Sequence, residues 1–393
     1  MKAIVNGKII TENEVLLGKT LIFNESIIDI ISDEDFSKAR KAGIYEETEI
    51  IDANQNYVSP GFIDLHIHGS KGSDTMDGDL EAIKIISRAL AENGVTAFLP
   101  TTMTMEKHKI YKALDSIKEA MAQKLQGAQV IGAHLEGPFI NEKCKGAQKA
   151  DCILEPDINF IKGYEDIIKI ITLAPEKDKD FKFIEAIKKN TSIKLSIGHS
   201  NATFEEAMGA IDKGVSRATH LFNAMSPMNH RKPGVVGAVF SSDINCEFIA
   251  DKIHVHAGLF PLIVKIKGKE KVLLITDCMR AGCLKEGISE LGGQKVIVSK
   301  ESATLEDGTL AGSILTLNKA VKNILQNTKL EIQEAVALAT INPARDIGID
   351  NKKGSISIGK DADIIIFDEE LSVKQTIVQG NTVYNKSIKK EGV

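Results

Sequence analysis

From residue 58 onward, short apolar runs rich in β-branched residues alternate with stretches whose apolar positions recur at helical spacing. This alternation predicts repeated strand–helix units around a parallel sheet. Two of the helices are expected over 80–93, ended by Gly94, and over 106–126, ended by Gly127. The eight expected strands are approximately 58–66, 95–100, 129–135, 167–173, 193–198, 215–219, 247–250 and 272–276. Eight units in about 280 residues predict an α/β fold, a closed (β/α)₈ barrel of the TIM type.

The two ends of the chain depart from this pattern. Residues 1–57 and 354–393 contain strand-like runs and turn residues such as Asn6-Gly7, but no helical periodicity. We therefore expect both ends to form one small β domain, a β-sandwich, with the barrel of residues 58–353 inserted between them.

Composition and charge narrow the classes of function. The chain has 393 residues, of which 43% are hydrophobic, and this is enough for a large packed core. Its net charge of −5 provides no basic surface for nucleic acid. No run approaches the roughly 18 apolar residues that cross a membrane, and the first residues lack the apolar segment of a secretory signal. The five cysteines are scattered without a CxxC pair, as is typical of reduced thiols, so we expect a cytoplasmic protein.

Side chains able to bind a metal follow five of the expected strands. The first strand ends in an HxH pair, and residues two apart on a strand project to the same side. Two histidines on a strand are alone weak evidence, but the carboxyl ends of barrel strands meet at one rim, where further candidates would join them. The six candidates are His66, His68, Glu136, His199, His220 and Asp277. Imidazoles and carboxylates spread over several strands suit a catalytic Zn²⁺ or a related first-row ion.

Several longer motifs add to the HxH pair. They are HLEGPF (134–139), GHSNAT (198–203), THLFNAM (219–225), IADKIHV (249–255), LITD (274–277) and GTLAGS (308–313). Together they resemble the N-acetylglucosamine-6-phosphate deacetylase family of the amidohydrolase superfamily, over essentially the whole chain. HLEGP, THLFNAM and GTLAGS are specific to this branch, whereas HxH and the later GKDADI (359–364) are widely shared.

The resemblance implies a divalent metal centre with two subsites. Glu136, His199 and His220 match the principal metal site of the family, and His66 and His68 match a second site that Glu136 bridges. Because the chain keeps both histidines of the HxH pair, we expect it to bind up to two ions. Zn²⁺ is the first expectation, with Fe²⁺, Mn²⁺ or Co²⁺ as alternatives because the same ligands accept them.

The resemblance also implies the reaction, which is deacetylation of N-acetyl-D-glucosamine 6-phosphate to D-glucosamine 6-phosphate and acetate. A metal-bound hydroxide would attack the amide, with Asp277 as the general base and acid as well as a metal ligand. Another phosphorylated N-acetyl hexosamine, such as N-acetylgalactosamine 6-phosphate, remains open as the substrate. A non-catalytic relative is disfavoured because the full ligand set is present.

For the sugar phosphate, the resemblance implies an anion site. It consists of backbone N–H groups of Asn223 and Ala224, together with Arg231 and His254, and Leu310 is a further substrate contact. An arginine suits phosphate because its planar fork can donate two parallel hydrogen bonds. In the family this arginine can come from the neighbouring subunit, so we expect a homodimer.

One substrate position departs from the family pattern. Gln148 stands where many relatives have a histidine close to the acetamide of the substrate. Glutamine can still donate an N–H bond, but it cannot become cationic. We therefore expect Gln148 to contact the substrate without an electrostatic role.

Overall fold

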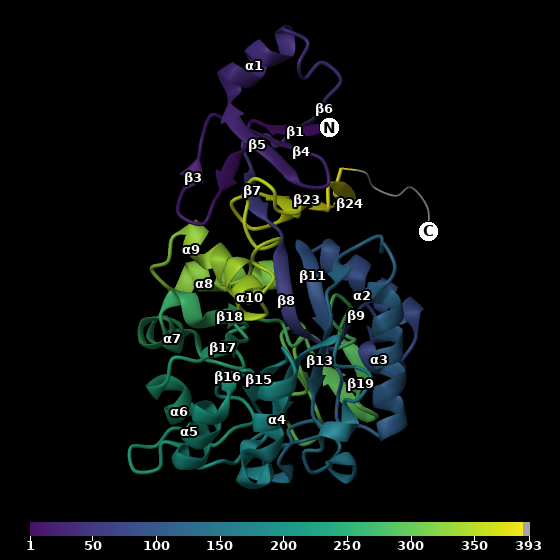
Figure 1. Ribbon diagram of the computed structural model, residues 1–393, viewed down its shortest axis with the longest axis vertical. Coiled ribbons are helices and arrows are strands. Elements are labelled where there is room, and N and C mark those ends of the chain that lie inside the picture. Colours follow the sequence, from purple (N-terminus) through teal and green to yellow (C-terminus); the bar gives the residue numbers. More distant parts are fainter. Residues whose placement is uncertain (388–393) are drawn as a thin grey trace.

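Eight parallel strands form a closed barrel in the computed structural model, which describes residues 1–387 (Figure 1). They are β8 (Phe62–Ile67), β11 (Val95–Pro100), β13 (Ala133–Glu136), β14 (Ile168–Leu173), β15 (Lys194–Ile197), β16 (Val215–Ala218), β17 (Asn245–Phe248) and β18 (Val272–Leu274). Bridges from Thr101 to His134 and from Ile67 to Cys278 close the ring between the two hydrogen-bonded sheets of these strands. The predicted fold class is confirmed.

The barrel strands are largely buried because helices cover their outer face while the barrel interior buries the other. All six residues of β8 and all six of β11 are buried. The short β12 (Gln129–Val130) pairs with β11 ahead of β13. The helices after β11 are α3 (Lys107–Met121), α4 (Lys182–Asn190), α5 (Phe204–Lys213), α6 (Gly234–Ser241), α7 (Phe260–Lys267), α8 (Leu317–Asn327), α9 (Ile332–Ala337) and α10 (Ile341–Asp346).

The two helices expected from the sequence are present, but both end earlier than expected, α2 (Leu80–Ala91) by two residues and α3 by five. Helix α2 begins after Asp79, whose side chain caps it, and the chain turns at Gly94 as expected. Helix α3 ends at Met121, five residues before the expected end. Gly127 is required for packing, because a Cβ there would lie 2.5 Å from the backbone of Ser87. This glycine permits close approach to α2 rather than capping α3.

The small β domain consists of a four-stranded sheet, β5-β4-β1-β6, and a six-stranded sheet, β24-β23-β22-β7-β2-β3. Its strands are β1 (Lys2–Val5), β2 (Lys8–Ile10), β3 (Val15–Leu16), β4 (Lys19–Phe23), β5 (Ile27–Ser32), β6 (Glu49–Asp52), β7 (Tyr57–Pro60), β22 (Ile364–Phe367), β23 (Val373–Val378) and β24 (Asn381–Asn385). The expectation that residues 1–57 lack a helix is wrong, because α1 (Asp33–Lys41) covers the outer face of the four-stranded sheet, at the end of the molecule far from the barrel (Figure 1). Residues 388–393, also expected in this domain, lie outside the described residues.

The strand expected over 58–66 is divided in two. Its first part, β7, pairs with β2 and β22 inside the small β domain, and only β8 belongs to the barrel. Gly61 lies at the break, where a Cβ would come within 2.1 Å of the Thr96 side chain. We propose that the boundary between the two units runs through Gly61.

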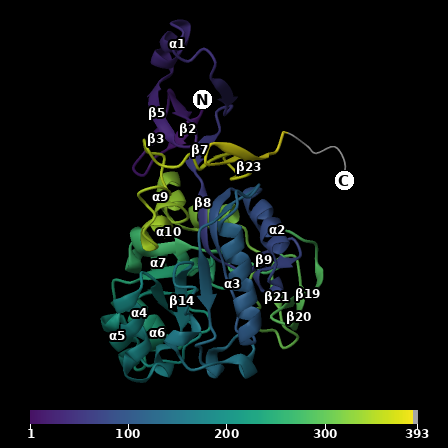
Figure 2. The ribbon, with the colours of Figure 1, turned by 45° about the vertical axis from the view of Figure 1, so that its right-hand side comes forward.

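Strand β22 joins the small β domain to the barrel through its alternating side chains. Ile364 and Ile366 belong to the core between the two sheets, whereas Ile365 and Phe367 belong to the barrel core, which also contains Phe62. Figure 2 shows the six-stranded sheet at the end of the barrel where β8 begins. The small β domain thus covers the amino-terminal ends of the strands and leaves the opposite end of the barrel free of it.

A three-stranded sheet that was not predicted from the sequence follows β18. It consists of β19 (Gly287–Leu291), β20 (Gln294–Val298) and β21 (Ala303–Thr304). Gly292 and Gly293 form its two-residue hairpin loop, and both have positive φ (59° and 81°), as a type I′ turn requires. This sheet packs through its own apolar cluster, which contains Leu291 and Met103. Within residues 1–387, no helix is long and apolar enough to cross a membrane.

Candidate metal centre and active site

A cavity of about 210 Å³ opens at the carboxyl ends of the barrel strands. Five of the six predicted metal ligands line it, namely His68, Glu136, His199, His220 and Asp277. The sixth, His66, lies buried directly behind them. The six residues that were predicted as ligands because they follow barrel strands therefore meet at one rim, as expected for a barrel of this type.

One oxygen of Glu136 contacts two imidazoles. Glu136 Oε1 lies 3.1 Å from His199 Nε2 and 3.1 Å from His220 Nε2, and these two nitrogens are 3.2 Å apart. The other ring nitrogen of each histidine faces a backbone carbonyl, Cys144 O at 2.9 Å and Asn223 O at 3.1 Å. Such a carbonyl holds a proton on Nδ1, so the lone pair of each Nε2 is directed towards Glu136.

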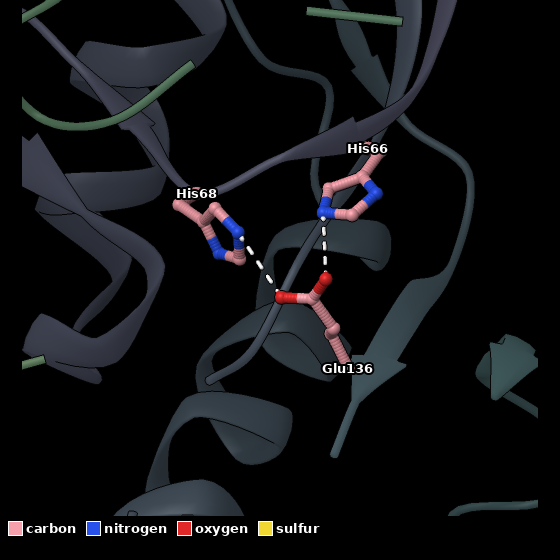
Figure 3. A group of neighbouring side chains, drawn as sticks. All are labelled: His66, His68 and Glu136. Carbon is pink, nitrogen blue, oxygen red and sulfur yellow. Dashed lines mark ion pairs between the residues drawn. The ribbon is translucent and has the colours of Figure 1, made fainter. Parts of the chain in front are cut away.

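A second group surrounds the HxH pair. Figure 3 shows both imidazoles facing the carboxylate of Glu136, with His66 Nε2 3.4 Å from Oε1 and His68 Nε2 3.3 Å from Oε2. Asp277 Oδ1 lies 3.4 Å from His66 Nε2 and 3.2 Å from His68 Nε2. Glu136 therefore bridges the two groups, which share its carboxylate.

The residues present fit a divalent metal ion. His66 Nε2 is a buried polar atom with no hydrogen-bond partner, although it points at two carboxylates. A buried nitrogen of this kind is costly unless it binds something. Four histidines and Glu136 form two groups able to hold a metal, and Asp277 lies against one of them. Imidazole nitrogens and carboxylate oxygens are a donor set typical of first-row divalent ions.

The backbone is strained at three of the predicted ligands. His199 (φ 49°), His220 (φ 31°) and Asp277 (φ 49°) all adopt the left-handed region, which costs of the order of 1–3 kcal/mol for each residue. Each follows within three residues the end of its barrel strand, β15, β16 or β18. The left-handed turn directs each side chain over the barrel mouth, and such strain is concentrated at functional sites.

The electrostatics of the site keep Glu136 charged. Burial alone would raise the pKa of Glu136, but His66 and His199 beside it hold this pKa well below its ordinary value. Burial alone would lower the pKa of His68, but Asp277 and Glu136 raise it to about 10. The carboxylates of the cluster thus favour positive charge beside them, either protons on the imidazoles or a metal cation.

Four of the six predicted substrate residues line the same cavity, namely Asn223, Ala224, His254 and Leu310, and the carbonyl of Asn223 is also the one that faces His220 Nδ1. His254 Nδ1 lies 2.6 Å from Asp251 Oδ2. Burial opposes the charge on His254, but this contact raises its pKa above the ordinary value. A histidine that holds its proton more strongly beside the cavity suits an anionic substrate.

The other two predicted substrate residues, Gln148 and Arg231, differ from these four in position and contacts. Gln148 also lines the cavity, and its Nε2 donates to Glu136 Oε2 (2.7 Å) while its Oε1 accepts from the backbone N–H of Thr104 (2.6 Å). Arg231 is exposed on a loop and lines a separate groove of about 710 Å³. Within a single chain, Arg231 is therefore not brought to the cavity.

Sequence reasoning missed the residues behind the ligands. Glu247 Oε2 lies 2.9 Å from His66 Nδ1, and the ring of His134 is 4.6 Å from that of His66. Burial and the adjacent His66 lower the pKa of His134 to about 3, so it is neutral. The sequence does contain a signal for them, because Arg217 and Glu247 are charged residues inside predicted barrel strands, where most side chains are buried.

Comparison with known proteins agrees with this arrangement. The model of the amidohydrolase family matches residues 57–383. The chain belongs to the amidohydrolase family. The N-acetylglucosamine-6-phosphate deacetylase of Bacillus subtilis is 40% identical over 96% of this chain and 95% of its own. A crystal structure of the N-acetylglucosamine-6-phosphate deacetylase from Pasteurella multocida superposes with a TM-score of 0.91, at 34% identity, covering 97% of this chain and 99% of that chain. The resemblance found in the sequence is confirmed.

A further relative differs in the sugar that its name contains. The N-acetylgalactosamine-6-phosphate deacetylase of Escherichia coli O157:H7 is 33% identical, over 84% of this chain and 89% of its own. Both kinds of relative are deacetylases of a phosphorylated N-acetyl hexosamine by name.

Proposed function

We propose that this protein hydrolyses the acetamide of N-acetyl-D-glucosamine 6-phosphate, releasing acetate and D-glucosamine 6-phosphate. The observation that carries the proposal is the ligand cluster, in which Glu136 joins two pairs of histidines at the mouth of an amidohydrolase barrel. The relative from Bacillus subtilis, with the same activity in its name, supports the choice of reaction.

The proposed centre holds up to two divalent ions, with Zn²⁺ as the first candidate. Glu136, His199 and His220 would hold one ion, and His66, His68 and Glu136 the other. A bound divalent ion would polarise the amide carbonyl and lower the pKa of a coordinated water from about 15.7 to about 7. Fe²⁺, Mn²⁺ and Co²⁺ accept the same ligands.

Asp277 is the proposed proton carrier. Its carboxylate lines the cavity and lies beside both imidazoles of the HxH pair, so it is within reach of a water held there. It takes a proton from the water that attacks the carbonyl carbon. It then delivers this proton to the amide nitrogen as the C–N bond breaks, so that acetate and the amine leave. General acid–base catalysis of this kind contributes about 10²–10⁴ in rate.

The phosphate is proposed to bind at the other side of the cavity. The backbone N–H of Ala224 and the imidazole of His254, whose pKa is raised, would contact it, Leu310 would contact the sugar, and Arg231 would come from a second subunit. The backbone N–H of Asn223 donates to the carbonyl of His220 (2.9 Å) and would have to be released from this bond to join them. The exposed position of Arg231 outside the cavity of its own chain supports a homodimer. We further propose a cytoplasmic location, where phosphorylated amino sugars are metabolised.

The alternative substrate is N-acetylgalactosamine 6-phosphate, which the relative from Escherichia coli favours. Acetate release from metal-loaded protein, measured with both phosphorylated sugars and with plain N-acetylglucosamine, decides between them. We expect the highest kcat/KM with the glucosamine derivative. A tenfold preference for the galactosamine epimer would overturn the choice of sugar, and no acetate from any of the three would overturn the function.

A further inference from the structure

Glu247 contacts both halves of the ligand cluster from inside the barrel. On β17, its Oε2 atom lies 2.9 Å from His66 Nδ1 and accepts the backbone N–H of His220 at 3.2 Å. His66 belongs to the subsite of the HxH pair and His220 to the other subsite. A single carboxylate oxygen thus contacts one residue of each.

Two further buried charged residues are linked to Glu247 by ion pairs. Arg217, on β16, pairs through one nitrogen with Glu247 Oε1 and through another with Asp346 Oδ2 at the end of α10. Asn245 Nδ2 donates to the remaining oxygen of Asp346 (2.7 Å). Arg217 and Glu247 are 0% exposed and Asp346 is 6% exposed. Glu247, Arg217 and Asp346 form what we call the buried charged chain.

Burying the charges of the buried charged chain costs free energy of folding, which suggests that these residues have a functional role. Taking charges out of water costs several kcal/mol for each ion, and apolar residues of equal size often stabilise a core better. Arg217 pairs with Glu247 Oε1, which leaves Oε2 of the same carboxylate to accept from His66 Nδ1 and the His220 N–H. A charged acceptor at His66 Nδ1 keeps the proton on that nitrogen.

The consequence concerns His66 Nε2. With the proton fixed on Nδ1, the Nε2 lone pair points at Glu136 and Asp277 and is free to bind an ion. His220, at φ 31°, is held in its strained turn by the hydrogen bond from its N–H to the same carboxylate. Both effects depend on the position of Glu247.

We propose that Glu247, held in place by Arg217 and Asp346, is a positioning residue that fixes the ring orientation and tautomer of His66 and the turn at His220, and so sets the metal affinity of the centre. The inference rests on the metal-dependent function proposed above. It adds to that function a device inside the barrel, outside the set of metal ligands.

The test compares Glu247→Gln with Asp363→Asn. Glutamine keeps the shape and one oxygen acceptor but removes the charge. The control breaks another buried ion pair, that of Asp363 with Lys353 (2.6 Å), in the small β domain. Zn²⁺ affinities of both subsites are measured by competition with a chromophoric chelator, and the melting temperature of each variant is measured alongside.

We expect Glu247→Gln to weaken Zn²⁺ binding at the HxH subsite by about 10- to 100-fold, and the other subsite by less. Asp363→Asn is expected to lose stability while both Zn²⁺ affinities stay within twofold of the unmodified protein. Unchanged affinities in a folded Glu247→Gln protein, or an equal loss in the control, would overturn the proposal.

A second measurement covers the case in which Glu247→Gln does not fold. In the unmodified protein labelled with ¹⁵N-histidine, NMR shifts of His66 are expected to show the proton on Nδ1 and, with Zn²⁺ added, a metal on Nε2. A His66 ring protonated on Nε2 alone before Zn²⁺ is added would overturn the proposal. This tautomer is read without any enzyme activity, so failure of the deacetylase function and failure of the positioning role are separate outcomes.

Discussion

Replacement of Asp277 by asparagine tests the central step of the proposed chemistry. Asp277 is buried at the cavity wall with φ 49°, a conformation that asparagine tolerates as readily as aspartate. The substitution therefore leaves the turn after β18 intact and keeps an oxygen near His66 and His68. What it removes is the carboxylate that is proposed to take and return a proton.

The expected loss follows from that single change. General acid–base catalysis supplies about 10²–10⁴ in rate, so Asp277→Asn should lower kcat by that factor, equivalent to about 2.7–5.4 kcal/mol of activation free energy. The assay is acetate release from N-acetylglucosamine 6-phosphate, with metal content measured by elemental analysis on the same sample. Asp251→Asn, at a carboxylate that contacts His254 rather than the ligands, is the matched control and should retain most of kcat.

The opposite result would be informative. If Asp277→Asn turned over within a few-fold of the unmodified protein while its metal content was unchanged, Asp277 would not carry the proton. If its metal content fell together with the rate, Asp277 would act chiefly as a metal ligand.

Four further predictions concern the substrate site and the metal. Gln148→Ala removes a hydrogen bond to the charged Glu136, worth about 1.5–3 kcal/mol, and should weaken Zn²⁺ binding measured by chelator competition; unaltered binding would leave Gln148 as a substrate contact alone. Arg231→Ala should raise KM for the 6-phosphate far more than for plain N-acetylglucosamine, and equal losses in steady-state assays would exclude a phosphate role. Asp251 raises the pKa of His254, so their attraction is present below the ordinary value of 6.5 and is lost as the pH rises through the raised value; in Asp251→Asn, kcat/KM for the phosphorylated substrate should therefore decline at a lower pH. Metal removal by a chelator should lower the melting temperature by about 3 °C. Free metal at 100 times Kd stabilises the native state by about 2.7 kcal/mol, and the unfolding entropy of a chain of 393 residues is about 0.8 kcal/mol per K. An identical melting curve without metal would contradict binding to the native state.

Much of the fold and the ligand set could be predicted from the sequence because both depend on local rules. Strands buried on both faces must be apolar runs, which located β11 to within the residues observed. Alternation along a strand places His66 and His68 on one side, and the common direction of barrel strands brings their carboxyl ends to one rim. Glu136, His199 and His220 could therefore be grouped before any contact was known.

Other features were decided only by the tertiary structure, because they depend on closure of the ring and on contacts between distant segments. Gly61 divides one apolar run between two units since its neighbour Thr96 leaves no room for a side chain. The contact between Gln148 and Glu136 required the loop after β13 to fold back over the rim. Glu247, Arg217 and Asp346 meet inside the barrel although up to 129 positions separate them, and no periodicity along the chain records which buried charges will face one another once the last strand pairs with the first.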